Sequence, residues 1–398
     1  MRSKPSVSIN ALSGAGFFEN EAAHLEEQMT DPISPDEDSI QDIDEAAEVI
    51  ETPYSITSYG ADYPVDSLVK RIDAKDILVP TFNWVAPEKT EIVGFQRQYV
   101  WPRPKADRFI ESLLLGLPVP GIFLVKEPTG ILLVLDGHQR LFTLQSFYNG
   151  AINDEVYRLS DIVQKRFVGM RYKDLDTEDR RRLDDSIIHA TVIRQDEPTE
   201  DQSSVYSIFE RLNTGGMNLQ PQEIRVALYH GELVRVLLTL NENLSWRKLV
   251  GAKSTRLKDM EMILRFFAFL YDYKKYEAPM KVFLNRYMAK NRSLALQSED
   301  TLSKTFSLTT ETILNGIGEK AFRPKRSVNA AVVDSLMTGM ARRLLMHHPI
   351  TDIASLKAHY DALIADTNYM EATETGTSQP TNITTRFTKA EQAFSQLQ

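Results

Sequence analysis

A short apolar run that stops at an Asp-Gly pair constrains the fold of this chain more than any other segment. Residues 131–135 are all aliphatic, Asp136-Gly137 follows, and residues 138–148 then show an amphipathic pattern. This order predicts a buried strand, a tight glycine turn and the beginning of a helix. A helix N-terminus presents free backbone N–H groups and a partial positive charge, so this corner is suited to an anion.

Two residues of this corner favour phosphate as the anion. Gly137 lets the backbone approach a ligand closely, because it has no side chain. Arg140, in the first turn of the expected helix, adds a planar fork of donors that matches phosphate oxygens. We therefore expect the function of the chain to depend on a phosphate group held here.

The net charge is divided unevenly along the chain. The whole sequence has 398 residues and a net charge of −9, whereas residues 1–51 alone carry −11, which leaves +2 for the remainder. The acidic segment has few aromatic residues and cannot bury enough apolar surface to offset its chain entropy. We expect residues 1–52 to form a disordered acidic tail, either an inert solvating leader or a segment that competes with nucleic acid for a basic groove.

Other features of the composition indicate where the protein works. The sequence contains no cysteine, which excludes disulfides and thiolate metal sites and fits a reducing compartment. No apolar run approaches the length of about 18 residues that a membrane span needs. The N-terminus lacks a signal-peptide pattern. We therefore expect a cytoplasmic protein without membrane contact.

The hydrophobic patterns predict an α/β domain over residues 53–215 and an all-α helical domain over residues 216–398. In the first domain we expect helices over 65–72, 104–115, 138–149 and 177–183, with Thr177 as an N-cap, and extended segments over 77–79, 121–126, 131–135, 166–171 and 187–194. A further helix is expected over 206–212. In the second domain we expect helices up to about residue 363 and a loop over the Thr-, Ser-, Gly- and Pro-rich residues 373–384.

Four motifs occur in a specific order. They are Gln-Arg-Gln-Tyr-Val-Trp at 96–101, Ser-Leu-Leu-Leu-Gly-Leu-Pro-Val-Pro at 112–120, Asp-Gly-His-Gln-Arg at 136–140, and Phe-Glu-Arg-Leu-Asn at 209–213 with Glu-Ile-Arg behind it at 223–225. In this order they resemble the N-terminal domain family of GmrSD-type modification-dependent (type IV) restriction proteins, a branch of the ParB/sulfiredoxin-like fold. The resemblance covers about residues 60–230. The family usually reads Asp-Gly-Gln-Gln-Arg, and here His138 replaces the first Gln.

The resemblance implies a nucleoside triphosphate and Mg²⁺ as cofactors, with nucleotide hydrolysis used to control attack on phage DNA. Asp136 would hold the metal, Gln139 would orient a water molecule or contact phosphate, and His138 could act as an acid or base. The expected nucleotide-binding residues are Gln96, Arg97, Gly137, Arg140, Arg211 and Asn213.

Each assignment has an ordinary structural alternative. Asp136 could cap a helix, Arg140 could form a surface salt bridge and Gln139 could face solvent. Arg97 could stack on Trp101 as part of the scaffold. Arg211 and Asn213 could merely cap their helix, and Glu223 and Arg225 could pair across the domain junction.

Three functions fit these residues. The first is an NTP-binding and NTP-hydrolysing subunit of a bacterial anti-phage restriction system that controls a partner nuclease. The second is a nucleotide- or DNA-binding ParB-like regulator without turnover. A nuclease in its own right is less supported, because the adjacent His347 and His348 point in different directions on a helix and His359 stands apart. DNA and a separate nuclease subunit are the partners expected beside the nucleotide, and the sequence leaves oligomerisation open.

Overall fold

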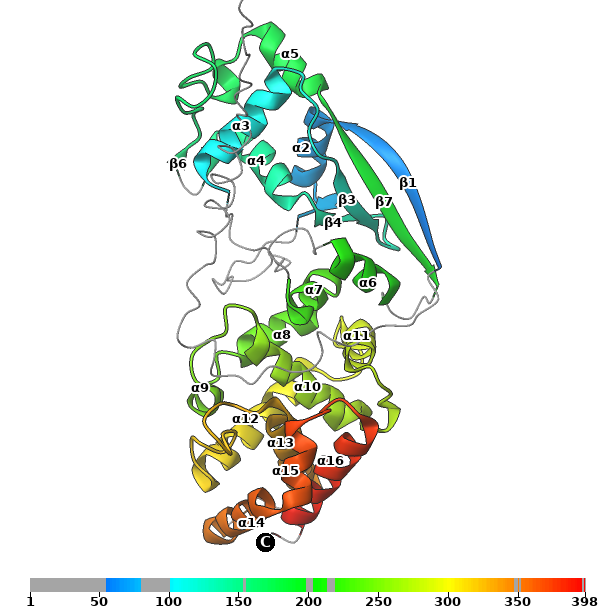
Figure 1. The fold of residues 1–398 in the computed structure, drawn as a ribbon, viewed down its shortest axis with the longest axis vertical. Helices are drawn as coiled ribbons and strands as arrows, with labels where there is room; N and C mark the ends of the chain where they lie inside the picture. The colour runs from blue at the N-terminus through cyan, green and yellow to red at the C-terminus, as the bar shows by residue number, and fades with distance from the viewer. Residues whose placement is uncertain are drawn as a thin grey trace, which may run out of the picture. The chain divides into compact units, whose positions relative to one another are not determined.

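The computed structural model describes residues 55–79, 101–152, 155–197, 203–212, 219–346, 350, 352–395 and 397. All of them belong to one compact unit, Ile40–Gln398. The predicted acidic tail lies outside the described residues. Within the described part of the chain, a mixed α/β region comes first and a run of helices follows it, as the sequence predicts (Figure 1).

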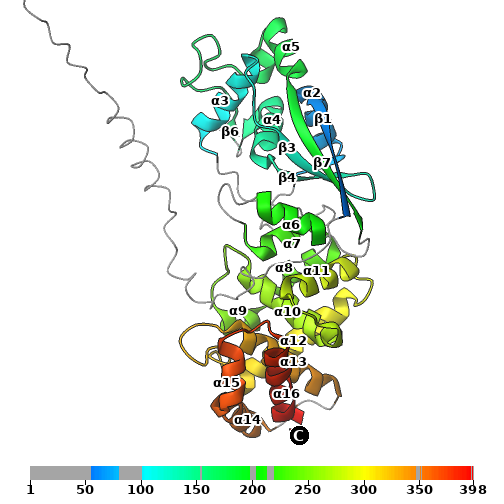
Figure 2. The same ribbon diagram turned by 45° about the vertical axis from the view of Figure 1, so that its right-hand side comes forward.

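A five-stranded sheet forms the centre of the mixed region. Its strands are β1 (Ser55–Pro64), β2 (Ile77–Leu78), β3 (Ile122–Lys126), β4 (Leu132–Asp136) and β7 (Ile187–Glu197). The order across the sheet is β1-β7-β3-β4-β2, with parallel pairs β7/β3 and β4/β2 and antiparallel pairs β1/β7 and β3/β4. Strands β1 and β7 run side by side as a long ribbon in both views (Figures 1 and 2). A separate two-stranded ladder joins β5 (Ala151–Ile152) to β6 (Glu155–Val156).

The central strands are buried on both faces, which explains why residues 131–135 carry no polar side chain. Leu124 and Val134 belong to a core that also contains residues of the helices α2 (Val65–Asp73), α3 (Arg103–Leu114) and α4 (His138–Asn149). Their neighbours Val125 and Leu133 point to the opposite face and join the core of the following helices. Side chains alternate across a strand, so a strand covered on both faces must be apolar at every position.

The remaining elements are helical. The 3-10 helix η3 (Tyr172–Asp174) and α5 (Thr177–Asp185) complete the mixed region. The helices that follow are α6 (Ser203–Leu212), α7 (Pro221–Leu228), α8 (Glu232–Leu240), α9 (Leu244–Val250), α10 (Lys258–Asp272), η5 (Tyr273–Lys275), α11 (Met280–Asn291), α12 (Glu299–Gly316), α13 (Ala330–Met346), α14 (Ile353–Ala365), α15 (Thr367–Glu374) and α16 (Pro380–Ser395). None of the described helices combines the length and the apolar character needed to span a bilayer.

The structure corrects three local predictions. Residues 166–171 form turns and not an extended segment. The N-cap of α5 is Asp176, whose carboxylate accepts the N–H of Asp179, so the cap lies one residue before the predicted Thr177. The predicted loop over 373–384 is mostly helical, because α15 runs to Glu374 and α16 begins at Pro380. The strand β1 was not predicted at all.

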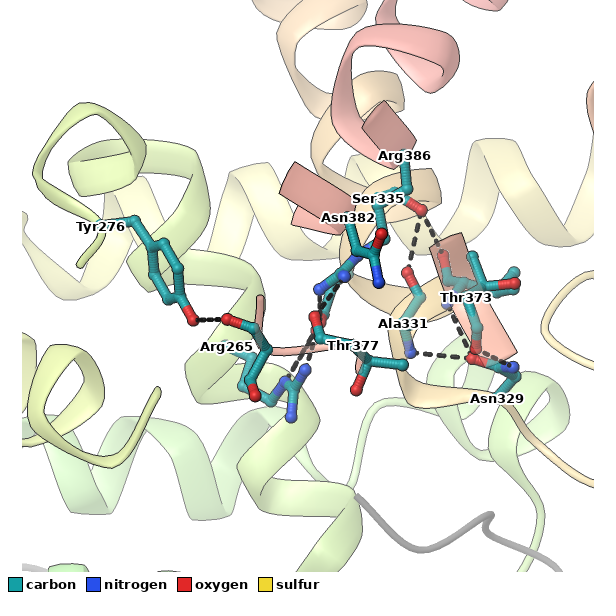
Figure 3. Close-up of polar contacts among 12 residues, drawn as sticks. Arg265, Tyr276, Asn329, Ala331, Ser335, Thr373, Thr377, Asn382 and Arg386 are labelled. Carbon is teal, nitrogen blue, oxygen red and sulfur yellow. Dashed lines mark hydrogen bonds and ion pairs between the residues drawn. The ribbon is translucent and has the colours of Figure 1, made fainter. Parts of the chain in front are cut away.

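A buried ion network joins three helices of the second region (Figure 3). Arg265 of α10, Asp334 of α13 and Arg386 of α16 are each completely buried. Arg265 donates to Asp334 at 3.0 and 2.5 Å, and the Arg386 Nη2 lies 3.4 Å from the same carboxylate. Arg386 also donates to the Thr377 carbonyl. Burial lowers the pKa of Arg386 to about 10, which shows that one carboxylate does not fully compensate two guanidinium groups.

We predict that Asp334→Ala strongly destabilises the protein. The substitution leaves two buried guanidinium groups without their shared anion, and breaking such a pair costs about 3–5 kcal/mol. The control is Asp300→Ala, since Asp300 is 70% exposed in its pair with Lys304 and should change the free energy of unfolding by less than about 1 kcal/mol. Urea denaturation of both variants checks this, and equal losses would contradict it.

Candidate functional site

The Asp-Gly corner has the predicted geometry, and it requires glycine. Strand β4 ends at Asp136, Gly137 is the N-cap of α4 with a φ of +100°, and α4 begins at His138. A Cβ on residue 137 would lie 2.3 Å from Cγ2 of Ile122 on β3 and 3.3 Å from the Arg140 Nη2. Gly137 is therefore needed both for its left-handed backbone and for close packing of the turn on β3.

Arg140 and Asp136 form an ion pair across this corner. The Arg140 Nη2 lies 2.7 Å from Asp136 Oδ2. The Arg140 side chain is only 13% exposed, whereas that of Asp136 is 51% exposed. The Arg140 Nε is buried and has no hydrogen-bond partner among the described residues. Asp136 is not the N-cap of α4, because the cap position is Gly137.

Gln139 faces inward and not toward solvent. Its side chain is 9% exposed, and its Oε1 accepts the backbone N–H of Trp101 at 3.3 Å. The Trp101 ring packs edge-on against Phe109 at 5.6 Å, and the Lys105 ammonium lies 4.9 Å from its centroid. Gln139 thus ties the end of the Gln-Arg-Gln-Tyr-Val-Trp motif to the first turn of α4.

The other predicted site residues divide into two groups. Gln96, Arg97 and Asn213 lie outside the described residues. His138 is half-buried at the first position of α4, and Arg211 is exposed in the last turn of α6. Helix α6 packs on the face of the sheet opposite α4. A role for Arg211 in the same site as Arg140 stays a prediction.

Glu223 and Arg225 of α7 are partnered within the helical region. Glu223 accepts the N–H of Gln220 at 2.6 Å and lies 3.1 Å from Arg256. The completely buried Arg225 donates to Glu261 and to Asn285, both at 3.1 Å. Both side chains therefore have structural partners here.

A buried polar cluster joins the β3–β4 turn to the helical region, and no local sequence pattern indicates it. Glu127, which is 5% exposed, accepts from the Arg292 Nη2 at 3.0 Å. The same nitrogen lies 2.8 Å from the His230 Nε2. Burial, followed by the charge of Arg292, lowers the pKa of His230. Neutral His230 accepts from Arg292, and we name Glu127, His230 and Arg292 the turn clamp.

No group of three or more His, Asp or Glu side chains among the described residues is arranged to hold a metal ion. Asp136 is the predicted metal ligand. Its half-exposed carboxylate stands at the corner beside Arg140. The geometry thus offers one carboxylate, one partly unsatisfied guanidinium and the N–H groups of a helix N-terminus in one place.

These features define a mixed α/β domain in which a central strand ends at a helix whose N-cap is a glycine in the left-handed conformation. Residues 82–230 match the family described as the GmrSD restriction endonuclease, N-terminal domain. The predicted resemblance to that family is therefore confirmed over this segment. No curated protein and no solved structure matches the chain. The ParB/sulfiredoxin-like fold stays a prediction.

We predict that Gly137→Ala destabilises the protein more than Gly130→Ala. Both glycines have positive φ, +100° and +89°, but a Cβ at residue 130 would meet nothing within 4 Å. The control therefore measures the backbone strain of about 1–3 kcal/mol, and the difference between the variants measures the clash with Ile122. Thermal unfolding distinguishes the two, and identical shifts in Tm would contradict the close-packed corner.

We also predict that the turn clamp makes stability depend on pH. The folded state lowers the pKa of His230 below its unfolded value of about 6.5. At pH values between these two pKa values, the unfolded chain therefore binds more protons than the folded protein. The stabilisation from neutral His230 is present above about pH 6.5 and is lost as the pH falls below that value. His230→Gln should flatten the fall in unfolding free energy between about pH 7.5 and 5.5, whereas the exposed-site control His189→Gln should not. A wild-type slope in His230→Gln would contradict this.

Proposed function

We propose that this chain binds and hydrolyses a nucleoside triphosphate as a subunit of an anti-phage restriction system. The observation that carries the proposal is the buried Arg140 Nε at the N-terminus of α4, which has no partner among the described residues. A buried donor without an acceptor costs free energy comparable to a lost hydrogen bond. A phosphate oxygen would satisfy it with a charge-assisted bond.

The N-terminus of α4 supports the same ligand. The N-cap residue Gly137 has no side chain that could accept the first backbone N–H groups of this helix. These groups and the helix dipole favour an anion at the position that Arg140 also faces. The left-handed backbone of Gly137 sets the turn that carries these N–H groups, and its close packing on Ile122 holds the turn in place.

Asp136 fits the role of a magnesium ligand. Magnesium in nucleotide sites is bound through one or two carboxylates and the phosphates of the substrate, with several waters retained. The half-exposed carboxylate of Asp136 at a phosphate-binding corner meets this requirement. Mg²⁺ would supply charge neutralisation during phosphoryl transfer, Gln139 would hold the Trp101 segment in place, and His138 would act as an acid or base.

The family match supports the proposed role in an anti-phage restriction system. The matching family is named for a restriction endonuclease, and the match covers residues 82–230, less than half of the chain. We infer that nucleotide turnover here controls a separate nuclease subunit that cuts DNA. Gln96, Arg97, Arg211 and Asn213 are the further nucleotide-binding residues in this proposal.

A non-hydrolysing nucleotide-binding regulator is the second candidate. The 2.7 Å ion pair between Asp136 and Arg140 favours it, because this pair occupies the carboxylate assigned to magnesium. Release of inorganic phosphate from NTP in the presence of Mg²⁺ distinguishes the two candidates.

We predict that Arg140→Ala weakens nucleotide binding about tenfold or more, since a charge-assisted contact is worth about 1.5–3 kcal/mol. Arg140→Lys should recover only part of the affinity, because an ammonium lacks the planar fork. Arg181→Ala, which removes an exposed guanidinium from α5, is the control and should bind normally. Calorimetric titration measures the three affinities. Wild-type affinity in a folded Arg140→Ala variant would contradict the site.

We predict that Asp136→Asn abolishes hydrolysis and retains part of the nucleotide affinity. The backbone amides of α4 and Arg140 bind phosphate without a metal, whereas phosphoryl transfer needs the charge neutralisation that Mg²⁺ provides. Phosphate release and nucleotide binding are measured on the same preparation. Full turnover by the Asn variant would show that Asp136 serves only as the ion-pair partner of Arg140.

A further inference from the structure

A cavity of about 670 Å³ lies where the C-terminal ends of α10, α13 and α16 meet. Its lining residues fall between Leu270 and Ser395, so it lies outside the segment that matches the restriction family. Small-molecule sites in proteins occupy about 300–1,000 Å³. The cavity therefore has the size of a site for an organic ligand.

One part of the wall is apolar. Leu270, Tyr271 and Tyr273 line it from the end of α10 and from η5, and Met346 lines it from the last residue of α13. Met346 is 74% exposed, although it is a large apolar side chain. An apolar body in the cavity would cover it and remove that surface from water.

The charged part of the wall carries an excess of cations. Four basic side chains line the cavity, against the acidic side chains of Asp272 and Glu391; the basic ones are Lys274, Lys275, Arg342 and Arg343. Lys275 pairs with Asp272 at 2.7 Å, and Arg342 pairs with Glu391. Lys274 is exposed and has no ion pair or hydrogen bond among the described residues.

Backbone carbonyl groups near the ends of helices bind two of these four cations, Arg342 and Arg343. A helix C-terminus carries a partial negative charge that basic side chains offset. Arg342 does this by donating to the Phe269 carbonyl in the last turn of α10 at 3.1 Å, and Arg343 donates at 3.0 and 2.5 Å to the Leu397 carbonyl, which lies two residues beyond the end of α16. Arg342 is thus held by a carboxylate and a carbonyl, and burial lowers its pKa. Lys274 is therefore the cation of the cavity wall that has no partner among the described residues and can meet an anion.

We propose that this cavity binds an amphipathic organic anion, with its apolar body against Leu270, Tyr271 and Met346 and its anionic group at Lys274. The inference does not depend on the nucleotide site. It adds a second ligand site to the helical region of the chain.

A matched pair of dyes tests the proposal on the full chain. Anilinonaphthalene sulfonate carries the anionic group, and phenylnaphthylamine offers a similar apolar body without it. Lys274→Glu should weaken binding of the sulfonate dye about fivefold or more at low salt, because it reverses a charge next to the anion, and should leave the neutral dye unchanged. Lys320→Glu, the same charge change at an exposed lysine outside the cavity, should leave both dyes unchanged.

A second variant tests the apolar half of the site. Met346→Asp introduces a carboxylate at an exposed position of the wall and should weaken binding of both dyes. Near-ultraviolet circular dichroism verifies that each variant is folded, since both dyes also bind unfolded protein. Equal effects of Lys274→Glu and Lys320→Glu on the sulfonate dye would overturn the proposal, as would unchanged binding of both dyes by Met346→Asp.

Discussion

The helical region is organised around a line of buried charges that alternate in sign. Arg225 of α7 pairs with Glu261 of α10, Arg265 of α10 pairs with Asp334 of α13, and Arg386 of α16 meets the same aspartate. Burying such groups costs several kcal/mol for each ion unless partners are placed accurately. The line therefore restricts how the four helices can pack, because a shift of one helix would leave a charge without its partner.

This line also explains why the end of the chain was difficult to predict. Residues 373–384 have the composition of a loop, but Pro380 is a favourable first residue for a helix, and Ile383, Phe387 and Phe394 recur on one face. The loop-like composition of this segment masks the helical period of these apolar residues. The contact of Arg386 with Asp334 joins residues 52 positions apart, so no local pattern could predict it.

The Asp-Gly corner between β4 and α4 was easier to predict than the end of the chain. Its backbone follows from the local sequence pattern, whereas its side-chain contacts follow from that pattern only in part. An apolar run, Asp-Gly and a following amphipathic pattern are local signals, and strand β4, Gly137 and helix α4 follow them. The spacing of four residues between Asp136 and Arg140 also permits their ion pair. The inward position of Gln139 depends on Trp101, 38 residues earlier, and the contact of Glu127 with Arg292 spans 165 residues. Such contacts arise from tertiary packing alone.

The turn clamp and the corner lie at opposite ends of one strand. The β3–β4 turn holds Glu127, strand β4 covers five residues, and Gly137 follows immediately. At about 3.3 Å per residue the strand separates the two ends by about 17 Å. Arg292 and His230 fix the first end to the helical region, while Ile122 fixes the second end against β3. A phosphate at the corner would thus meet backbone amides on a strand-helix unit that is held at both ends, which lowers the free energy cost of ordering the site on binding.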